Sequence, residues 1–253
     1  MSDVVIIGLG QMGLVFSNGF LRLGHAVHPA LRGTDLDALA AAVPAPEVVL
    51  VAVGEGDLPP VLARMPEPWR DRLLLLQNEL LPEDWRRHGV ADPTVAVVWF
   101  EKKKGKPVHV VIPTVVSGPN AALVASALEA LEIPVRVGPP DRLLFELVKK
   151  NLYILTANLA GLEAGGTVSA LWAEHRDLAR DVAAEVLALQ AFRAGEPLPQ
   201  RELIAGMVEA FEGDPEHGCT GRSAPARLRR ALGQAKQAEL HLPTLERLGD
   251  RHL

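Results

Sequence analysis

The stretch "VVIIGLGQMG", residues 4–13, decides the fold of the N-terminal part, because four β-branched residues run directly into three glycines spaced G-x-G-x-x-G. Residues 4–7 have the pattern of a strand that is buried on both faces. Residues 11–23 carry apolar side chains at helical spacing and end before Gly24, a suitable helix C-cap. The stretch therefore predicts a strand, a glycine turn and a helix in that order.

Each glycine has a physical role in such a turn. Gly8 allows the tight bend, Gly10 lets the backbone approach a pyrophosphate, and Gly13 permits close packing of helix on strand. The N–H groups at the helix start, at Gln11 and Met12, then face the phosphates of a dinucleotide. A turn that needs small residues only for packing is the alternative. The strand–turn–helix context favours dinucleotide binding.

The rest of the chain up to residue 138 continues this pattern. Further strands are expected at 25–33, 47–54, 72–78 and 93–101, and short helical stretches separate them. This alternation is typical of a doubly wound parallel sheet of the Rossmann type, in the α/β class. A polar, glycine-containing tip within residues 101–113 predicts a hairpin added to the sheet, and one more helix and strand complete this part.

Strand patterns end at residue 139. Helical periodicity follows over residues 141–164, 167–193, 199–212 and 225–240. Because a proline pair directly precedes the first of these helices, we expect a domain boundary there. The prediction is a dinucleotide-binding domain at 1–138 and an all-helical domain for substrate binding or dimerisation at 139–253.

Composition narrows the functional class. The net charge is −5, and the only concentrated basic run, residues 102–106, is interpreted as a solvated hairpin tip, so no nucleic-acid partner is expected. The single cysteine, Cys219, fits the reducing cytoplasm. The sequence has no signal-peptide pattern, no apolar stretch of transmembrane length and no HExxH or CxxC motif. We therefore expect a cytoplasmic protein with no membrane partner and no metal site.

The end of the second expected strand, "ALRGTD" at residues 30–35, indicates which cofactor is bound. An acid at this place binds the ribose hydroxyls of NAD, whereas an arginine accommodates the 2′-phosphate of NADP. Arg32 occupies the deciding position, and Asp35 is expected to start the next helix. A surface arginine with no ligand is the alternative. The sequence favours NADP.

Four segments resemble the ketopantoate reductases (2-dehydropantoate 2-reductases), within the larger group of 6-phosphogluconate-dehydrogenase-like reductases. They are "GLGQMG" followed by "LGHAVHPALR", "LLLLQNELL" from residue 73, "VWFEKKKGKPVHVVIPTVVSGP" from residue 98, and "LLFELVKKNLYILTANLAGL" from residue 143. The resemblance becomes loose beyond the last of them. It implies hydride transfer from NADPH to the carbonyl of a small 2-oxo acid.

The resemblance also implies a lysine on the first helix of the helical domain as general acid, with asparagines nearby that orient the substrate. Anchoring on Asn151 puts Leu147 at the family's lysine position, so Lys150, one turn away, is the candidate proton donor. Lys149 is expected to point further off this face. Two exposed lysines on an amphipathic helix are the alternative. Asn78, in "LLLLQNELL", is the candidate near both cofactor and substrate.

Further substrate-binding candidates lie later in the chain. Asn158 supplies a second amide two turns beyond Asn151. The segment "HGCTGRSAPARL", residues 217–228, matches the place of a family serine and glutamate but offers Thr220, Arg222 and Ser223 instead. An arginine beside two hydroxyls suits a carboxylate or a phosphate, although a plain loop between helices would carry the same residues.

Two functions from different classes remain open. The first is an NADPH-dependent reductase of a small carbonyl substrate, ketopantoate reductase-like but with altered catalytic positions. The second is a catalytically silent NADP-binding sensor or regulatory protein, which the absence of the family lysine, at Leu147, and of the family glutamate both favour. Glu79 also replaces a family glycine after Asn78, where it is expected to crowd or re-aim the site. The family includes monomers and dimers, so a homodimer is compatible with either function.

Overall fold

The structure is a computed structural model that describes residues 2–253. The described chain forms two compact units, which divide between Glu146 and Leu147. The division falls inside helix α6 (Leu143–Ala164) and not after residue 138 as the sequence predicted. The reason is that the first turn of α6 still belongs to the first unit, where Glu146 accepts a hydrogen bond of 2.7 Å from Arg136 Nη2.

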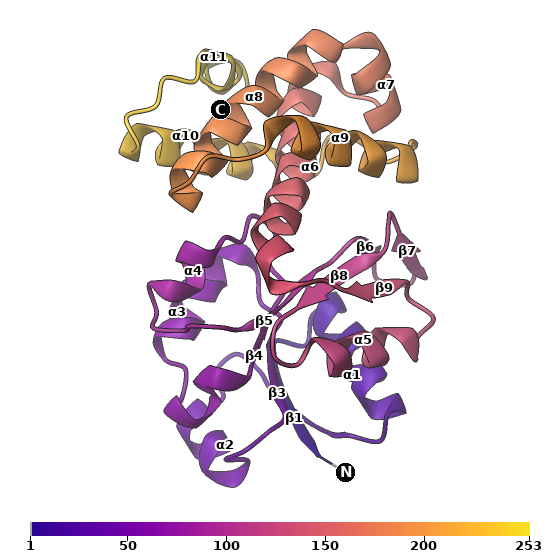
Figure 1. The fold of residues 1–253 in the computed structure, drawn as a ribbon, viewed down its shortest axis with the longest axis vertical. Coiled ribbons are helices and arrows are strands. Elements are labelled where there is room, and N and C mark those ends of the chain that lie inside the picture. The colour runs from indigo at the N-terminus through magenta and orange to yellow at the C-terminus, as the bar shows by residue number, and fades with distance from the viewer. Residues whose placement is uncertain (1) are drawn as a thin grey trace. The chain divides into compact units, whose positions relative to one another are not determined.

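A seven-stranded sheet forms the centre of the first unit (Figure 1). Its strands are β1 (Asp3–Ile7), β2 (Ala26–Ala30), β3 (Val48–Val51), β4 (Leu73–Leu75), β5 (Thr94–Val97), β8 (Thr114–Ser117) and β9 (Val135–Val137). They lie in the order β2-β1-β3-β4-β5-β8-β9. The first five are parallel, and β8 with β9 runs in the opposite direction. The predicted doubly wound α/β fold is confirmed.

Helices cover both faces of this sheet. They are α1 (Gln11–Arg22), α2 (Leu36–Ala42), α3 (Leu58–Ala63), α4 (Pro82–Arg86) and α5 (Ala121–Glu129), with short 3₁₀ turns η1 (Glu55–Asp57), η2 (Glu67–Arg72) and η3 (Pro140–Arg142). Figure 1 shows α1 and α5 on one side of the sheet and α2, α3 and α4 on the other. Phe16 and Phe20 of α1 are fully buried against Val4 and Ile6, which stabilises the sheet by roughly 1.5–3 kcal/mol per side chain.

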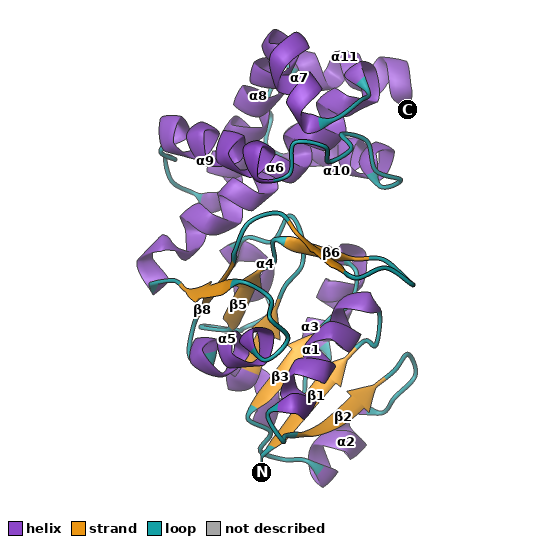
Figure 2. Ribbon diagram, turned by 90° about the vertical axis from the view of Figure 1, so that its right-hand side faces the viewer, coloured by secondary structure: helices purple, strands orange, loops and turns teal. Residues whose placement is uncertain are grey.

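The predicted hairpin does not extend the sheet. Strands β6 (Phe100–Lys102) and β7 (Val108–Val110) pair with each other as a separate two-stranded sheet (Figure 2). Residues 93–101 therefore contain two strands, because the chain leaves the main sheet at Trp99. The Trp99 N–H donates to Thr114 Oγ1 at 3.1 Å, and its carbonyl accepts from the N–H of Val111 at 2.8 Å.

The second unit is all helical, as predicted. After α6 it contains α7 (Val168–Glu174), α8 (Arg176–Ala194), α9 (Gln200–Gly213), α10 (Ala224–Gln237) and α11 (Pro243–His252). Residues 167–193 form two helices that break at His175, and α11 was not predicted. Glu185 of α8 caps α11, accepting from the N–H groups of Thr244 at 2.7 Å and Leu245 at 2.8 Å. Within residues 2–253, no helix has both the length and the apolar character that crossing a membrane requires.

Candidate functional site

Two of the three turn glycines are required by the fold itself. Gly8 has φ +96°, in the left-handed region, and a Cβ there would lie 2.8 Å from the carbonyl oxygen of Ala52. A Cβ on Gly13 would collide with the carbonyl oxygen of Gly8. The β1–α1 turn is thus packed tightly against the end of β3 on its inner side.

Gly10 is different, because its outer side is open. A Cβ on Gly10 would meet nothing within 4 Å. Gly10 is the N-cap residue of α1, no side chain caps this helix, and its first turn contains no acidic residue. The N–H groups at Gln11 and Met12 therefore begin a twelve-residue helix that has neither a side-chain cap nor an acidic residue of its own at its positive end. This geometry fits a pyrophosphate, which needs close approach to the backbone and uncapped donors.

Arg32 lies on a tight turn at the end of β2. The Thr34 N–H donates to the Leu31 carbonyl at 3.0 Å, the Leu31 N–H donates to Thr34 Oγ1 at 2.9 Å, and Gly33 takes φ +92°. The turn leaves the Arg32 side chain exposed. Strand β2 pairs with β1 in parallel, so this turn and the glycine turn follow the same edge of the sheet.

Asp35 is the acid nearest to Arg32 in the sequence, and it has a structural partner. Its Oδ1 accepts hydrogen bonds from the N–H groups of Asp37 at 3.0 Å and Ala38 at 3.1 Å. It is therefore the N-cap of α2, as the sequence predicted. The side chain presented at the end of β2 is a cation.

The loop after β4 carries Asn78 and a residue that sequence reasoning missed, Gln77. Gln77 Nε2 donates to the carbonyls of Val51 at 2.6 Å and Val53 at 3.2 Å, so it ties this loop to the end of β3. Asn78 Nδ2 donates to Glu55 Oε1 at 3.3 Å. The position of Gln77 directly before Asn78 in "LLLLQNELL" could have drawn attention to it. Its hydrogen-bond partner Val51, however, lies 26 residues earlier in the chain.

Glu79, at the place of a glycine in the resemblance, has a backbone conformation of the kind that favours glycine. Its φ is +60°, in the left-handed region that side chains disfavour by roughly 1–2 kcal/mol. The loop therefore takes a glycine-like path at this position while carrying a carboxylate.

On α6 the two adjacent lysines have different surroundings. Lys150 is half-buried, with Nζ 5.7 Å from the centre of the Tyr153 ring. Lys149, which the sequence interpretation set aside, is only 6% exposed. Its stem lies against Gly206 of α9. Leu147 is buried as well.

Asn151 lies in the interior of the helical unit. It is 1% exposed, and its Nδ2 donates to Gln190 Oε1 of α8 at 2.9 Å. The amide therefore has a partner on a neighbouring helix, which fixes α6 against α8. This contact indicates that Asn151 positions the helix.

Asn158 of α6 contacts the segment 217–228, in which the sequence analysis placed further substrate-binding candidates. Its Oδ1 accepts from Arg227 Nη1 at 3.3 Å, and a Cβ on Gly221 would lie 3.4 Å from the same oxygen. Thr220 Oγ1 donates to the carbonyl of Gly161 at 2.9 Å. Both Arg222 and Ser223 are exposed on this loop.

The guanidinium beside Asn158 belongs to Arg227, whereas Arg222, the arginine that the sequence selected in this segment, is exposed on the loop. Arg227 is 8% exposed and was missed by sequence reasoning. Its position one residue before Leu228, on the buried stripe of α10, was the available signal, because a charged residue on such a stripe normally has a partner.

No group of three histidine, cysteine or acidic side chains among residues 2–253 could hold a metal ion. Cys219 is buried beneath Gly161, and burial raises the pKa of its thiol to about 11. A thiol with so high a pKa is a poor nucleophile at neutral pH.

The fold of this chain, an α/β unit followed by an all-helical unit, is similar to that of solved ketopantoate reductases. Three solved structures illustrate the likeness. A PanE/ApbA family ketopantoate reductase from Ralstonia eutropha is 20% identical, with a TM-score of 0.69, over 98% of this chain and 96% of its own. The dimeric ketopantoate reductase of Staphylococcus aureus is 17% identical, with a TM-score of 0.64 and the same coverage of both chains.

The third structure is a D-mandelate dehydrogenase in a ternary complex with NADH and anilino(oxo)acetate, 14% identical with a TM-score of 0.68 over 98% of this chain and 96% of its own. The TM-scores of the three structures establish a shared fold. No family model matches the sequence, and no curated protein sequence matches it.

Proposed function

We propose that this chain is an NADPH-dependent reductase of a small carbonyl compound of the 2-oxo acid type. The observation that carries the proposal is the turn between β1 and α1. Its Gly10 has open space on the outer side, and α1 begins there without a side-chain cap. Arg32 follows β2 at the same edge of the sheet. The solved structures of the same fold support it, since they are ketopantoate reductases and a D-mandelate dehydrogenase with NADH.

The choice of NADPH over NADH rests on two side chains. An NAD-binding protein has an acid in this region that binds the ribose hydroxyls. The carboxylate of Asp35 instead caps α2. Arg32 is exposed on the adjoining turn and can donate two parallel hydrogen bonds to a 2′-phosphate. The glycine turn holds the pyrophosphate through the backbone at Gly10, Gln11 and Met12.

NADPH, when bound, supplies a hydride to the carbonyl carbon of the substrate. The carbonyl oxygen then takes a proton, and the product is the 2-hydroxy acid. We assign the donation of this proton to the Lys150 ammonium, which also stabilises the negative charge that develops on the oxygen. Asn151 holds α6 in place through Gln190, and Asn78 is oriented by Glu55.

The substrate carboxylate is assigned to the cluster around Asn158. Arg227 is largely buried beside Asn158, and a guanidinium in such a setting binds a carboxylate through paired hydrogen bonds. Thr220, Arg222 and Ser223 lie on the loop that leads into the same helix. They supply hydroxyls and a second cation for the rest of the substrate.

Two measurements test this function. Calorimetric titration should give tighter binding of NADPH than of NADH. A panel of 2-oxo acids and cyclic imines should include a compound that causes steady NADPH consumption. Equal affinity for the two cofactors, or no binding of either, would contradict the proposal that the chain is an NADPH-dependent reductase.

A silent NADP-binding protein is the second candidate function. It is favoured by Leu147, a buried apolar residue at the place where the resemblance implies a lysine. Tight NADPH binding without turnover across the whole panel would select this function over the reductase.

We also propose that the chain forms a homodimer and works in the cytoplasm. A ketopantoate reductase of the same fold is described as dimeric, and the single buried cysteine fits a reducing compartment. Sedimentation equilibrium over a range of concentrations should give twice the chain mass of 27.2 kDa. A single-chain mass throughout would contradict the dimer.

A further inference from the structure

The helical unit contains a cavity between α7, the start of α8 and the end of α9. Its volume is about 310 Å³. Apolar side chains make most of its wall, chiefly Trp172, Ala173, Val208 and Phe211. This volume is at the small end for ligand pockets, which begin near about 300 Å³, so it suits a molecule with a single ring.

The aromatic wall is held rigidly. The rings of Trp172 and Phe211 meet edge to face, with centres 6.2 Å apart. Phe211 is only 2% exposed and also packs on Tyr153, with ring centres 5.4 Å apart. A wall fixed on both sides in this way keeps its shape when no ligand is present.

The charged residues at the rim of this cavity indicate which type of ligand it binds. Arg176 lines the cavity, with its guanidinium carbon 5.1 Å from the centre of the Trp172 ring. Arg180, one turn later on α8, lies 6.0 Å from the same ring. Glu212 is the one acid among the lining residues. Arg176 and Glu212 are the charged residues of the lining itself, and Arg180 adds a second guanidinium beside Trp172, outside the lining. Guanidinium groups next to an apolar wall suit an organic anion.

We propose that this cavity is a binding site for a small carboxylate with an apolar, ring-sized body. The ring lies against Trp172 and Phe211, and the carboxylate accepts hydrogen bonds from Arg176. The lining residues include neither the glycine turn nor Lys150, Asn158 or Arg227. The site is therefore separate from the one proposed for hydride transfer.

Phenylacetate is the probe, added to the full chain without NADPH. Trp172 is half-buried, whereas the other three tryptophans are at most 3% exposed, so the fluorescence change reports the cavity. We expect a saturable change that is lost in Trp172→Phe. Calorimetry should show that Arg176→Gln weakens binding by about tenfold or more, as expected for loss of a charge-assisted hydrogen bond. Ala173→Trp should block binding by filling the space.

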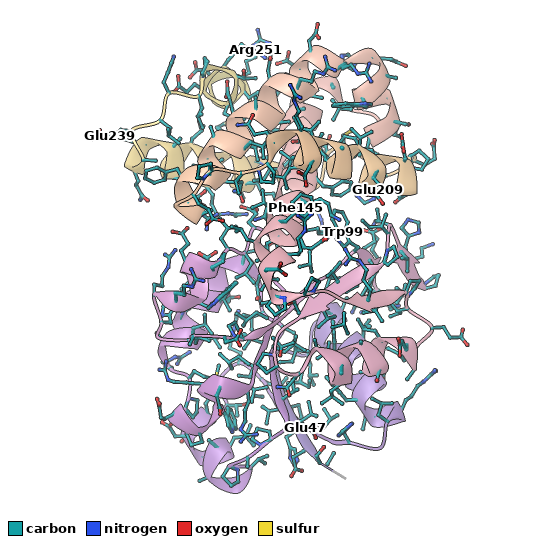
Figure 3. All side chains as sticks on the ribbon, viewed as in Figure 1. Glu47, Trp99, Phe145, Glu209, Glu239 and Arg251 are labelled. Atoms are coloured by element: carbon teal, nitrogen blue, oxygen red, sulfur yellow. The ribbon has the colours of Figure 1, made fainter. Side chains whose placement is uncertain are left out.

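The controls separate the charge of the ligand from its ring, and this cavity from the substrate site. Phenylacetamide, which has the ring without the charge, should bind more weakly than phenylacetate. Glu209→Gln changes a charge on α9 outside the cavity and should leave affinity unchanged (Figure 3). Absence of saturable binding, equal affinity for the amide, or binding that survives both Arg176→Gln and Ala173→Trp would overturn the proposal. None of these results bears on NADPH binding.

Discussion

The stem of Lys149 passes over Gly206: a Cβ on this glycine would lie 2.6 Å from Lys149 Cδ and 3.2 Å from Cγ. Gly206 is in the middle of α9, where glycine is less favourable than alanine by roughly 0.8–1.0 kcal/mol. The close contact explains why a helix-weakening residue stands there, because any larger residue would displace the lysine.

A double-mutant cycle tests this relationship. Gly206→Ala in the Lys149→Ala background should raise the free energy of unfolding by about 0.8–1.0 kcal/mol, because helix propensity improves and no stem is displaced. In the otherwise unchanged protein the same substitution should give no gain. Urea unfolding of the four proteins measures the coupling. Equal effects in both backgrounds would mean that the lysine stem does not restrict position 206.

Local sequence was sufficient for the parts of the fold that depend on local physics. The glycine turn, the N-cap Asp35 and most strands of the sheet follow from chain periodicity, φ requirements and capping. The hairpin was correctly located but given to the wrong sheet, because the departure of the chain at Trp99 depends on Thr114, fifteen residues later.

The missed contacts of the candidate site depend on partners distant in the sequence. Asn151 was interpreted as substrate-facing, but it bonds Gln190, 39 residues away on another helix. Arg227 reaches Asn158 over 69 residues. Such contacts arise only when helices pack, and helical periodicity gives the buried face of a helix without giving the partner.

Arg32→Ala should remove most of the preference for NADPH over NADH. Loss of a charge-assisted contact to the 2′-phosphate should weaken NADPH binding by about 1.5–3 kcal/mol and leave NADH binding nearly unchanged. Calorimetric titration measures both affinities. Asp35→Ala is the matched control: it should lower stability by roughly 0.5–2 kcal/mol through loss of the α2 cap, without changing the preference. A preference that survives in Arg32→Ala would remove the basis for choosing NADPH.

Gly10→Val should abolish dinucleotide binding while the fold is retained. The structure has open space for a side chain at Gly10, and its φ of −72° is accessible to any residue. The branched side chain would occupy the place where a pyrophosphate approaches the backbone. Circular dichroism and calorimetry together check this prediction. Gly13→Ala is the contrast, since its Cβ would collide with the Gly8 carbonyl and should destabilise the turn itself.

Glu163 should make a small, pH-dependent contribution to stability. Its carboxylate accepts hydrogen bonds from Arg247 at 2.6 Å and Arg251 at 3.1 Å, and these contacts, Arg247 first, hold its pKa below the ordinary value of 4.5. Because the folded-state pKa is the lower one, the contribution is complete above the unfolded-state pKa and is lost as the pH falls through the folded-state pKa. Glu163→Gln should therefore lower the Tm at neutral pH, and the difference should disappear on acidification. A constant difference at every pH would contradict an ionic cause.

Lys150→Met should lower kcat by a factor of about 10² to 10⁴ with NADPH affinity little changed, as expected for removal of a general acid. Lys150 is half-buried on α6 beside Tyr153, and no histidine occurs between residues 110 and 174 to replace it. Steady-state kinetics with the best substrate of the panel, together with calorimetric titration of NADPH, checks both parts of the expectation.

Lys149→Met is the matched control. Its stem is buried along Gly206, so methionine preserves most of the packing and removes only the ammonium. We expect kcat to remain close to that of the unchanged protein. If Lys149→Met shows the large loss and Lys150→Met does not, the buried lysine is the proton donor. If both variants retain full turnover, neither lysine delivers the proton and the general acid must be another group.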